Sequence, residues 1–225
     1  HGRSVAWGAQ MCGIKCKIYI HQNVSKARAR AVEDLGAEVV WVKGNYDDSL
    51  HLVKRHTIEN QWHIISDTSY EGYMYIPKYV MAGYSVMTAE INLQHISNQP
   101  PTHIIIQGGV GGLAGTVCTH MAKLWTDRPR FIVVEPYSAD CLYQSAKNNS
   151  PTAVEVTTET MMAGLSCGEV SILGWNILKD NADDFITITD DLVAPAMKIL
   201  ANGMGNDPKI EAGESAVGGL ALLLA

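Results

Sequence analysis

The stretch His103-Ile-Ile-Ile-Gln-Gly-Gly-Val-Gly-Gly-Leu-Ala-Gly115 decides the fold. Its first five residues predict a short strand, residues 108–112 predict a glycine turn, and residues 113–124 predict a helix. Glycines allow positive φ angles and let the backbone approach a ligand without a Cβ in the way. The first amides of the helix point into the same space, with the positive end of the helix dipole behind them. The pattern therefore predicts a phosphate-binding turn that needs no basic side chain.

Other interpretations of this turn remain open at the level of sequence. It is not a Walker loop, because no Gly-Lys-Ser/Thr follows it. A dinucleotide-binding turn would need an acidic residue at a strand end about 20 positions further on. Only Glu135, which is followed by Pro136, stands near that distance. Glycine-rich turns also occur for packing alone, and that alternative stays open beside phosphate binding.

Strands alternate with helices on both sides of this turn. We expect strands at residues 16–20, 38–42, 62–66, 103–107, 131–135 and 185–189, and helices at 3–13, 25–35, 47–60, 76–96, 113–124, 139–146, 171–179, 192–203 and 214–223. This alternation predicts an α/β fold, a three-layer αβα arrangement with parallel sheets. The break Asn98-Gln-Pro-Pro101 predicts two lobes, a smaller one at 1–97 and part of a larger, cofactor-binding one at 98–225.

Composition narrows the class of protein. The 225 residues are 47% hydrophobic and 18% charged, which is typical of a folded core. The net charge of −6, without a basic stripe, argues against a nucleic-acid partner and against an anionic membrane surface. Five cysteines at irregular spacing indicate reduced thiols and a cytoplasmic protein, and neither they nor the histidines show the spacing of a metal site.

The ends of the chain indicate an internal segment of a longer protein. No residue that could cap a helix precedes the run at 3–13, and the chain stops inside the apolar run Ala216–Ala225.

Several motifs, in order, resemble those of known enzymes. The sequence is similar to the pyridoxal-phosphate enzymes of fold type II, the tryptophan synthase β type, at His1-Gly-Arg-Ser-Val-Ala-Trp-Gly-Ala9, Gln107–Gly115, Val134-Glu-Pro136 and Gly213-Glu-Ser-Ala216. More narrowly it resembles the diaminopropionate ammonia-lyase family at Asn45-Tyr-Asp-Asp48, Ser66-Asp-Thr-Ser-Tyr-Glu-Gly-Tyr73, Ala139-Asp-Cys141, Met162-Ala-Gly-Leu-Ser-Cys-Gly-Glu169, Gly174-Trp175 and Gly205-Asn-Asp-Pro208. The resemblance runs almost from end to end.

The resemblance implies a cofactor, pyridoxal 5'-phosphate, and a reaction, the α,β-elimination of 2,3-diaminopropionate to pyruvate and ammonia. It implies that Gly108, Gly109, Val110, Gly111, Gly112 and Leu113 hold the cofactor's phosphate. It also implies that His1 opens a helix lying against the cofactor's ring, that Glu214 faces the ring, and that the full-length protein is a homodimer.

Asp67 is the candidate catalytic base. The resemblance places an acidic group here that removes the α-proton, and the predicted strand at 62–66 would bring Asp67 to a carboxyl end of the sheet, where ligands collect. Asp-Thr-Ser is also good turn and capping chemistry, so a structural role for Asp67 is the alternative. Glu214 has a similar alternative, since an acidic residue in a first helical turn complements the helix dipole.

Parts of the family's active site are missing from this sequence. The Schiff-base lysine of such enzymes lies upstream of the His-Gly-Arg motif, and none of the eleven lysines here stands in a Ser-x-Lys setting. We therefore expect these 225 residues alone to be inactive. Two other functions stay open: a threonine or serine dehydratase-like enzyme with the same cofactor, and a non-catalytic α/β segment that binds phosphate.

Overall fold

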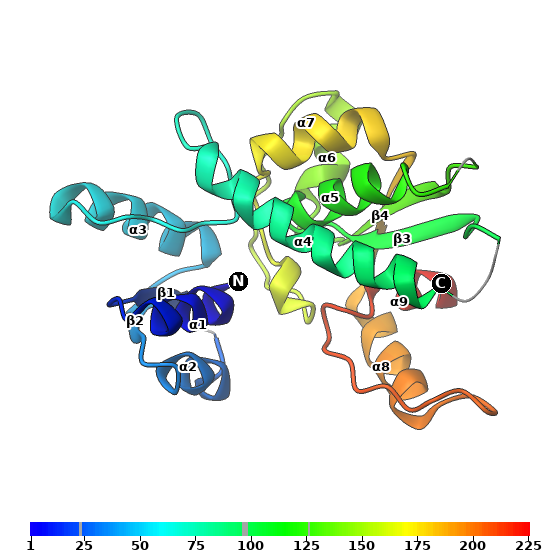
Figure 1. Cartoon of the computed structure of the whole chain (residues 1–225), viewed down its shortest axis with the longest axis horizontal. Helices are drawn as coiled ribbons and strands as arrows, with labels where there is room; N and C mark the ends of the chain where they lie inside the picture. The colour runs from blue at the N-terminus through cyan, green and yellow to red at the C-terminus, as the bar shows by residue number, and fades with distance from the viewer. Residues whose placement is uncertain (23, 96–98, 126) are drawn as a thin grey trace. The chain divides into compact units, whose positions relative to one another are not determined.

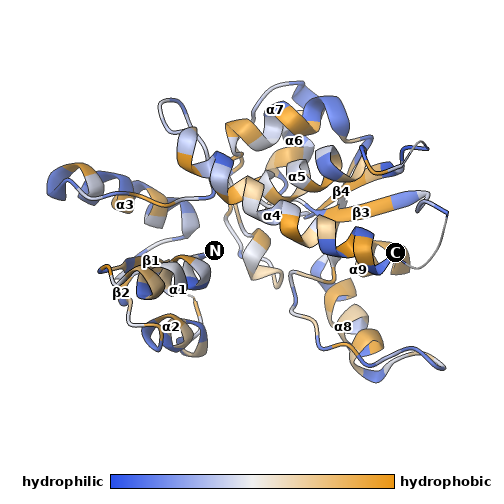
Figure 2. Ribbon diagram, in the orientation of Figure 1, coloured by the Kyte–Doolittle hydropathy of each residue, from blue (hydrophilic) through white to orange (hydrophobic). Residues whose placement is uncertain are grey.

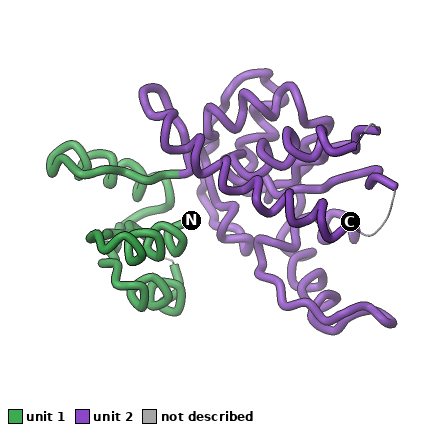
Figure 3. The backbone as a smooth tube through the Cα atoms, viewed as in Figure 1, with its two compact units in different colours: residues 1–66 green, residues 67–225 purple. Residues whose placement is uncertain are grey.

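The computed structural model describes residues 1–22, 24–95, 99–125 and 127–225 (Figure 1). They form two compact units, His1–Ser66 and Asp67–Ala225 (Figure 3). The predicted break at 98–101 begins outside the described residues, as does the lobe boundary predicted between residues 97 and 98. The helix before that break belongs to the second unit because it packs on the helix after the glycine turn, and Thr116 Oγ1 donates to the carbonyl of Met81 at 3.1 Å. The assignment of 1–97 to a smaller lobe stays a prediction about the whole protein.

The first unit holds two parallel strands and three helices. These are α1 (Gly2–Cys12), β1 (Lys17–His21), α2 (Lys26–Glu33), β2 (Glu38–Val42) and α3 (Tyr46–Asn60). The two strands pair in parallel with Lys17 opposite Glu38. Two of these helices, α2 and α3, begin where polar side chains accept first-turn amides: Ser25 Oγ accepts from the Arg28 amide, and Asn45 forms a capping box with Asp48. That box starts α3 at Tyr46, one residue earlier than expected.

The prediction of a strand at residues 62–66 is wrong. Among the described residues of this unit, β1 and β2 pair with each other, and residues 62–66 have no regular secondary structure. Contacts with other elements hold the segment instead: His1 Nε2 lies 2.9 Å from the carbonyl oxygen of Ile65, and the Lys17 ammonium lies 5.4 Å from the Trp62 ring centroid. An apolar run becomes a strand only where a neighbouring strand offers its edge, and a local pattern does not reveal such an edge.

The second unit is built on a parallel sheet in the order β3-β4-β5. Its strands are β3 (His103–Gln107), β4 (Arg130–Pro136) and β5 (Asp184–Ile188), paired in parallel throughout. Its helices are α4 (Tyr75–Gln94), α5 (Gly112–Met121), α6 (Cys141–Asn148), α7 (Ile172–Asn181), α8 (Val193–Asn202) and α9 (Gly218–Leu224), with short 3-10 turns η1 (Ala163–Leu165) and η2 (Asp190–Leu192). The strands and the α-helices lie within a few residues of the predicted positions, whereas the two 3-10 turns were not predicted.

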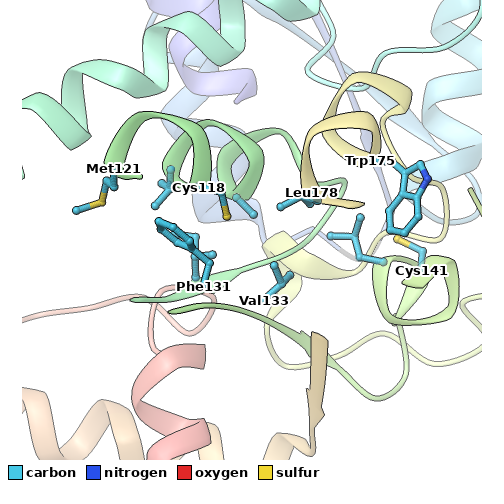
Figure 4. Packing of buried hydrophobic residues seen from close by; sticks show 11 residues of the cluster. Cys118, Met121, Phe131, Val133, Cys141, Trp175 and Leu178 are labelled. Atoms are coloured by element: carbon cyan, nitrogen blue, oxygen red, sulfur yellow. The ribbon is translucent and has the colours of Figure 1, made fainter. Parts of the chain in front are cut away.

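Helices cover both faces of this sheet. Side chains alternate across a strand, and on β4 the buried Phe131 and Val133 join a core cluster with α5 and α7 (Figure 4). Val134 points the other way, into a cluster with α8 and α9. Figure 2 shows hydrophobic residues along the strands of this sheet. The α/β fold with parallel sheets, in three layers within this unit, is thereby confirmed.

One helix boundary changes a site residue. The helix predicted to start at Glu214 starts at Gly218, because residues 214–217 form turns instead. The suggested role of Glu214 in complementing a helix dipole is therefore wrong. None of the helices that the structure describes is long and apolar enough to cross a membrane.

Candidate functional site

The glycine turn has the conformation that the sequence predicts. Gly109 and Gly111 adopt φ angles of 59° and 95°, which side-chain-bearing residues rarely take. The Gly108 amide donates to the Val134 carbonyl at 2.9 Å, and the Gly111 amide closes the turn on the Gly108 carbonyl at 3.1 Å. Among the described residues, the amides of Gly109 and Val110 donate to no acceptor.

The start of α5 adds further donors beside this turn. Gly112 and Leu113 occupy its first turn, where amides have no acceptor within their own helix. The turn and the helix start therefore gather unused N–H donors at the carboxyl end of β3. This is the arrangement that binds a phosphate.

Two glycines are required by packing rather than by a ligand. A Cβ on Gly108 would lie 2.7 Å from Glu135 Cγ, and a Cβ on Gly174, in α7, would lie 2.7 Å from the carbonyl carbon of Gly111. The close contacts at Gly108 and Gly174 support the packing alternative, and the amide donors of Gly109, Val110, Gly112 and Leu113 leave phosphate binding open beside it.

Glu135 lies against Gly108 of the glycine turn and binds the start of α6. Its buried carboxylate accepts the amides of Tyr143 at 2.7 Å and Leu142 at 3.2 Å, at the start of α6. Burial raises the pKa of this carboxyl to about 8, although the two backbone donors act in the opposite direction. The role of Glu135 as a ribose-binding acid of a dinucleotide site is therefore wrong, because its oxygens are engaged with α6. In the sequence, the signal for a buried acid is the glutamate within the apolar run of β4.

Asp67 lies next to the glycine turn. Its carbonyl oxygen is 3.8 Å from the position that a Cβ on Gly112 would take. The pKa of the Tyr84 phenol is raised by burial and, secondarily, by the charge of Asp67. Although the strand predicted before it is absent, Asp67 is brought beside the first residue of α5.

The turn that carries Glu214 is fixed to the end of β3. Gln107 Nε2 donates to the carbonyl of Ala216 at 2.6 Å, and Ser215 Oγ accepts the Gly164 amide at 2.9 Å. Glu214 itself is half-buried. His1 belongs to the first unit, where its ring contacts the Ile65 carbonyl. The cofactor contacts expected of His1 and Glu214 stay predictions.

Sequence reasoning missed two buried serines. Ser69 and Ser171 are 1% and 0% exposed, and their hydroxyl oxygens are 2.7 Å apart. Ser69 stands in the predicted turn and capping motif and Ser171 at a predicted helix start, but no local pattern pairs the two, because they are separated by 102 positions in the sequence.

No lysine is buried at this site. Ten of the eleven lysines are exposed, and Lys54, on α3, is half-buried. Among the described residues, no three His, Cys, Asp or Glu side chains stand close enough together to hold a metal ion.

Comparison with known proteins identifies the family. The family model described as "Pyridoxal-phosphate dependent enzyme" matches residues 1–225. The chain belongs to this family. The fold type II architecture that the motifs imply is thereby confirmed.

Within this family, the chain is similar to ammonia-lyases. It is 39% identical to the diaminopropionate ammonia-lyase of Escherichia coli K12 over 100% of its own length and 57% of that protein. A crystal structure of the Escherichia coli enzyme with an aminoacrylate–PLP azomethine intermediate matches with a TM-score of 0.90 at 37% identity, over 100% of this chain and 57% of that one. The mitochondrial threonine dehydratase of Schizosaccharomyces pombe is 26% identical over 88% of this chain and 31% of that protein. The chain thus spans 57% of the length of this curated lyase.

The residues present fit the phosphate of pyridoxal phosphate. Its dianionic group matches the amides between Gly109 and Leu113 and the positive end of α5. The lysine that holds the cofactor covalently has no buried counterpart among residues 1–225.

Proposed function

We propose that the protein carrying this chain is an ammonia-lyase that converts 2,3-diaminopropionate and water into pyruvate and two molecules of ammonia. The observation that carries the proposal is the placement of Asp67 against the phosphate-binding turn, beside Gly112. The greater identity to a diaminopropionate ammonia-lyase, 39% against 26% for a threonine dehydratase, favours this substrate over a hydroxyamino acid.

The glycine turn holds the cofactor in place. The amides of Gly109, Val110, Gly112 and Leu113 bind the phosphate without a mobile cationic side chain, so its position is set by the backbone. Glu135 and Gly174 keep this backbone in place from the side of α6 and of α7. When bound, pyridoxal phosphate supplies an electron sink for the charge that develops at the substrate's α-carbon.

Asp67 removes the substrate's α-proton. A carboxylate suits this step because it accepts a proton from a carbon whose acidity the cofactor raises. Its half-buried position limits water around the carboxylate. In this proposal His1 and Glu214 contact the cofactor's ring, on the strength of the motifs that contain them.

The cellular location, the partners and the oligomeric state of the protein are part of the proposal. A cytoplasmic location is supported by the odd number and irregular spacing of its five cysteines. The net charge of −6 supports a protein without a nucleic-acid or membrane partner. A homodimer is supported by large apolar side chains left exposed on α4, among them Tyr75, Val86 and Leu93. Light scattering of the full-length protein tests the dimer.

A substrate comparison tests the reaction. We expect the full-length protein with pyridoxal phosphate to release pyruvate and ammonia from 2,3-diaminopropionate with a kcat/KM at least about 100-fold above that for threonine or serine. Such a gap is expected where an amine leaving group is recognised by a site built for it. A preference for threonine or serine would make the protein a dehydratase, and turnover of none of the three would overturn the proposal.

A further inference from the structure

Two serines from distant parts of the second unit form a buried joint. The Ser69 amide donates to Ser171 Oγ at 3.0 Å, and the two hydroxyl oxygens are 2.7 Å apart. Both residues are at most 1% exposed, so water does not compete for these bonds. A buried hydroxyl without a hydrogen-bond partner here would lower the stability of the fold, so each serine needs the other.

Ser69 caps α7 from outside that helix. Its carbonyl accepts the Ile172 amide at 3.1 Å, and its hydroxyl accepts the Leu173 amide at 2.8 Å. Ser171 holds the N-cap position but makes no side-chain bond to its own helix. The side chain that would ordinarily cap the helix is turned to Ser69, and Ser69 does the capping in its place.

The same joint reaches the glycine turn. The Ser171 amide donates to the carbonyl of Val110 at 2.8 Å. One turn of helix further on, the backbone of Gly174 presses against that of Gly111. The start of α7 therefore fixes the middle of the phosphate-binding turn.

The serine pair is also connected to Asp67 through the backbone. Ser69 stands two residues after Asp67, and the Asp67 carbonyl lies against Gly112. A short path thus runs from the half-buried Asp67 through the buried Ser69 and Ser171 to the half-buried Val110. Through these bonds Ser69 and Ser171 connect the backbone that carries Asp67 to the backbone of Val110.

We propose that Ser69 and Ser171 are positioning residues that set the distance between the Asp67 carboxylate and the cofactor's phosphate site. This inference rests on the proposed function, in which Asp67 takes the α-proton. A displacement of about 1 Å at a reacting group costs up to about 100-fold in rate, so a joint of this kind has a measurable effect on catalysis.

Hydrogen exchange of the full-length protein without substrate tests the joint directly. In Ser171→Ala, we expect amides in 68–74 and in 108–114 to exchange about tenfold faster together, because the alanine removes the acceptor of the Ser69 amide. The matched control is Ser145→Ala, another fully buried serine, whose hydroxyl donates to the Cys141 carbonyl at 2.6 Å and accepts the Thr152 amide at 2.8 Å. We expect it to leave both segments at the wild-type rates. If Ser171→Ala does not fold, Ser171→Cys, with a weaker acceptor, is used with the same expected direction.

Kinetics of the same variants test the consequence for catalysis. With 2,3-diaminopropionate, Ser171→Ala should lower kcat about 10- to 100-fold while KM changes less than about threefold. The isotope effect for substrate deuterated at the α-carbon should rise, because proton removal becomes slower; a purely structural role would not move it.

The inference is overturned if either segment keeps its wild-type exchange rate, or if kcat and the isotope effect are unchanged. A wild-type protein that does not act on diaminopropionate contradicts the proposed function instead, and the exchange experiment separates the two failures because it needs no substrate.

Discussion

Glu135 shows how a single buried carboxyl responds to its surroundings. Burial favours the protonated acid, whereas the amides of Leu142 and Tyr143 favour the carboxylate, and the balance raises its pKa to about 8. Between a pH near the ordinary glutamate value and pH 8, the folded state holds a proton that the unfolded state has released. Stability from this group is therefore greatest in acid and is lost as the pH rises through that window.

Glu135→Gln should flatten this dependence. In the full-length protein without cofactor, the free energy of unfolding of the wild type, relative to that of Glu135→Gln, should fall with pH between about 5 and 8. The slope is at most about 1.4 kcal/mol per pH unit, the value for one proton. Urea denaturation at several pH values measures it. A difference that rises with pH, or stays constant, would show that Glu135 is ionised throughout.

Asp67→Asn tests whether Asp67 is the catalytic base. Asparagine keeps the shape of the side chain but accepts no proton, so kcat should fall about 100- to 10,000-fold with 2,3-diaminopropionate. The absorbance of bound pyridoxal phosphate should be retained. The control is Glu71→Gln, an exposed acid four residues further along, which should keep its kcat. Equal activity of the two variants would remove Asp67 from the mechanism.

At the scale of elements, sequence patterns predict what local chemistry decides. Ser25 marks the start of α2, as predicted, because its side chain bonds a nearby amide. Asn45 caps α3, although the sequence pattern favoured a start at Asp47 or Asp48. The run at 103–107 becomes β3 because its branched side chains are flanked by a glycine turn. The run at 62–66 is not a strand, and α9 begins at Gly218 rather than Glu214. Both depend on distant partners: the edge of a neighbouring strand, and the contacts that tie the turn before α9 to Gln107 and Gly164.

Gly174→Ala tests the packing of α7 on the glycine turn. The new methyl group would lie 2.7 Å from backbone that has no room to move, so the variant should lose about 1–3 kcal/mol of stability and bind pyridoxal phosphate more weakly. Gly83→Ala, in α4, is the matched control. Its Cβ would meet nothing within 4 Å, so it should gain up to about 1 kcal/mol and keep cofactor affinity. Urea denaturation and cofactor titration measure both, and equal effects of the two substitutions would contradict the close contact.

At the scale of the whole molecule, the order of motifs predicts the family and the fold better than it predicts how the site is assembled. Gly109, Gly111 and Asp67 were found because each has a local signature. Ser69, Ser171 and the anchoring role of Glu135 were not, because they depend on contacts between segments far apart in the sequence. Such contacts exist only in the folded chain.

The distribution of lysines leads to a prediction for the full-length protein. All eleven lysines of this chain lie on the exposed surface or, for Lys54, half-buried on α3. Borohydride reduction of the holoenzyme should therefore attach the cofactor to a lysine outside residues 1–225, as peptide mapping would show, and these residues expressed alone should release no ammonia. A modified peptide containing any of the eleven would contradict this assignment.

The account depends on backbone amides holding the cofactor's phosphate. The measurement that tests this most directly is a crystal structure of the full-length holoenzyme. We predict phosphate oxygens about 2.7–3.2 Å from the amide nitrogens of Gly109, Val110, Gly112 and Leu113, with the Asp67 carboxylate facing the reactive side of the cofactor. A phosphate held by lysine or arginine side chains elsewhere, with the turn at 108–113 filled by protein atoms, would contradict it.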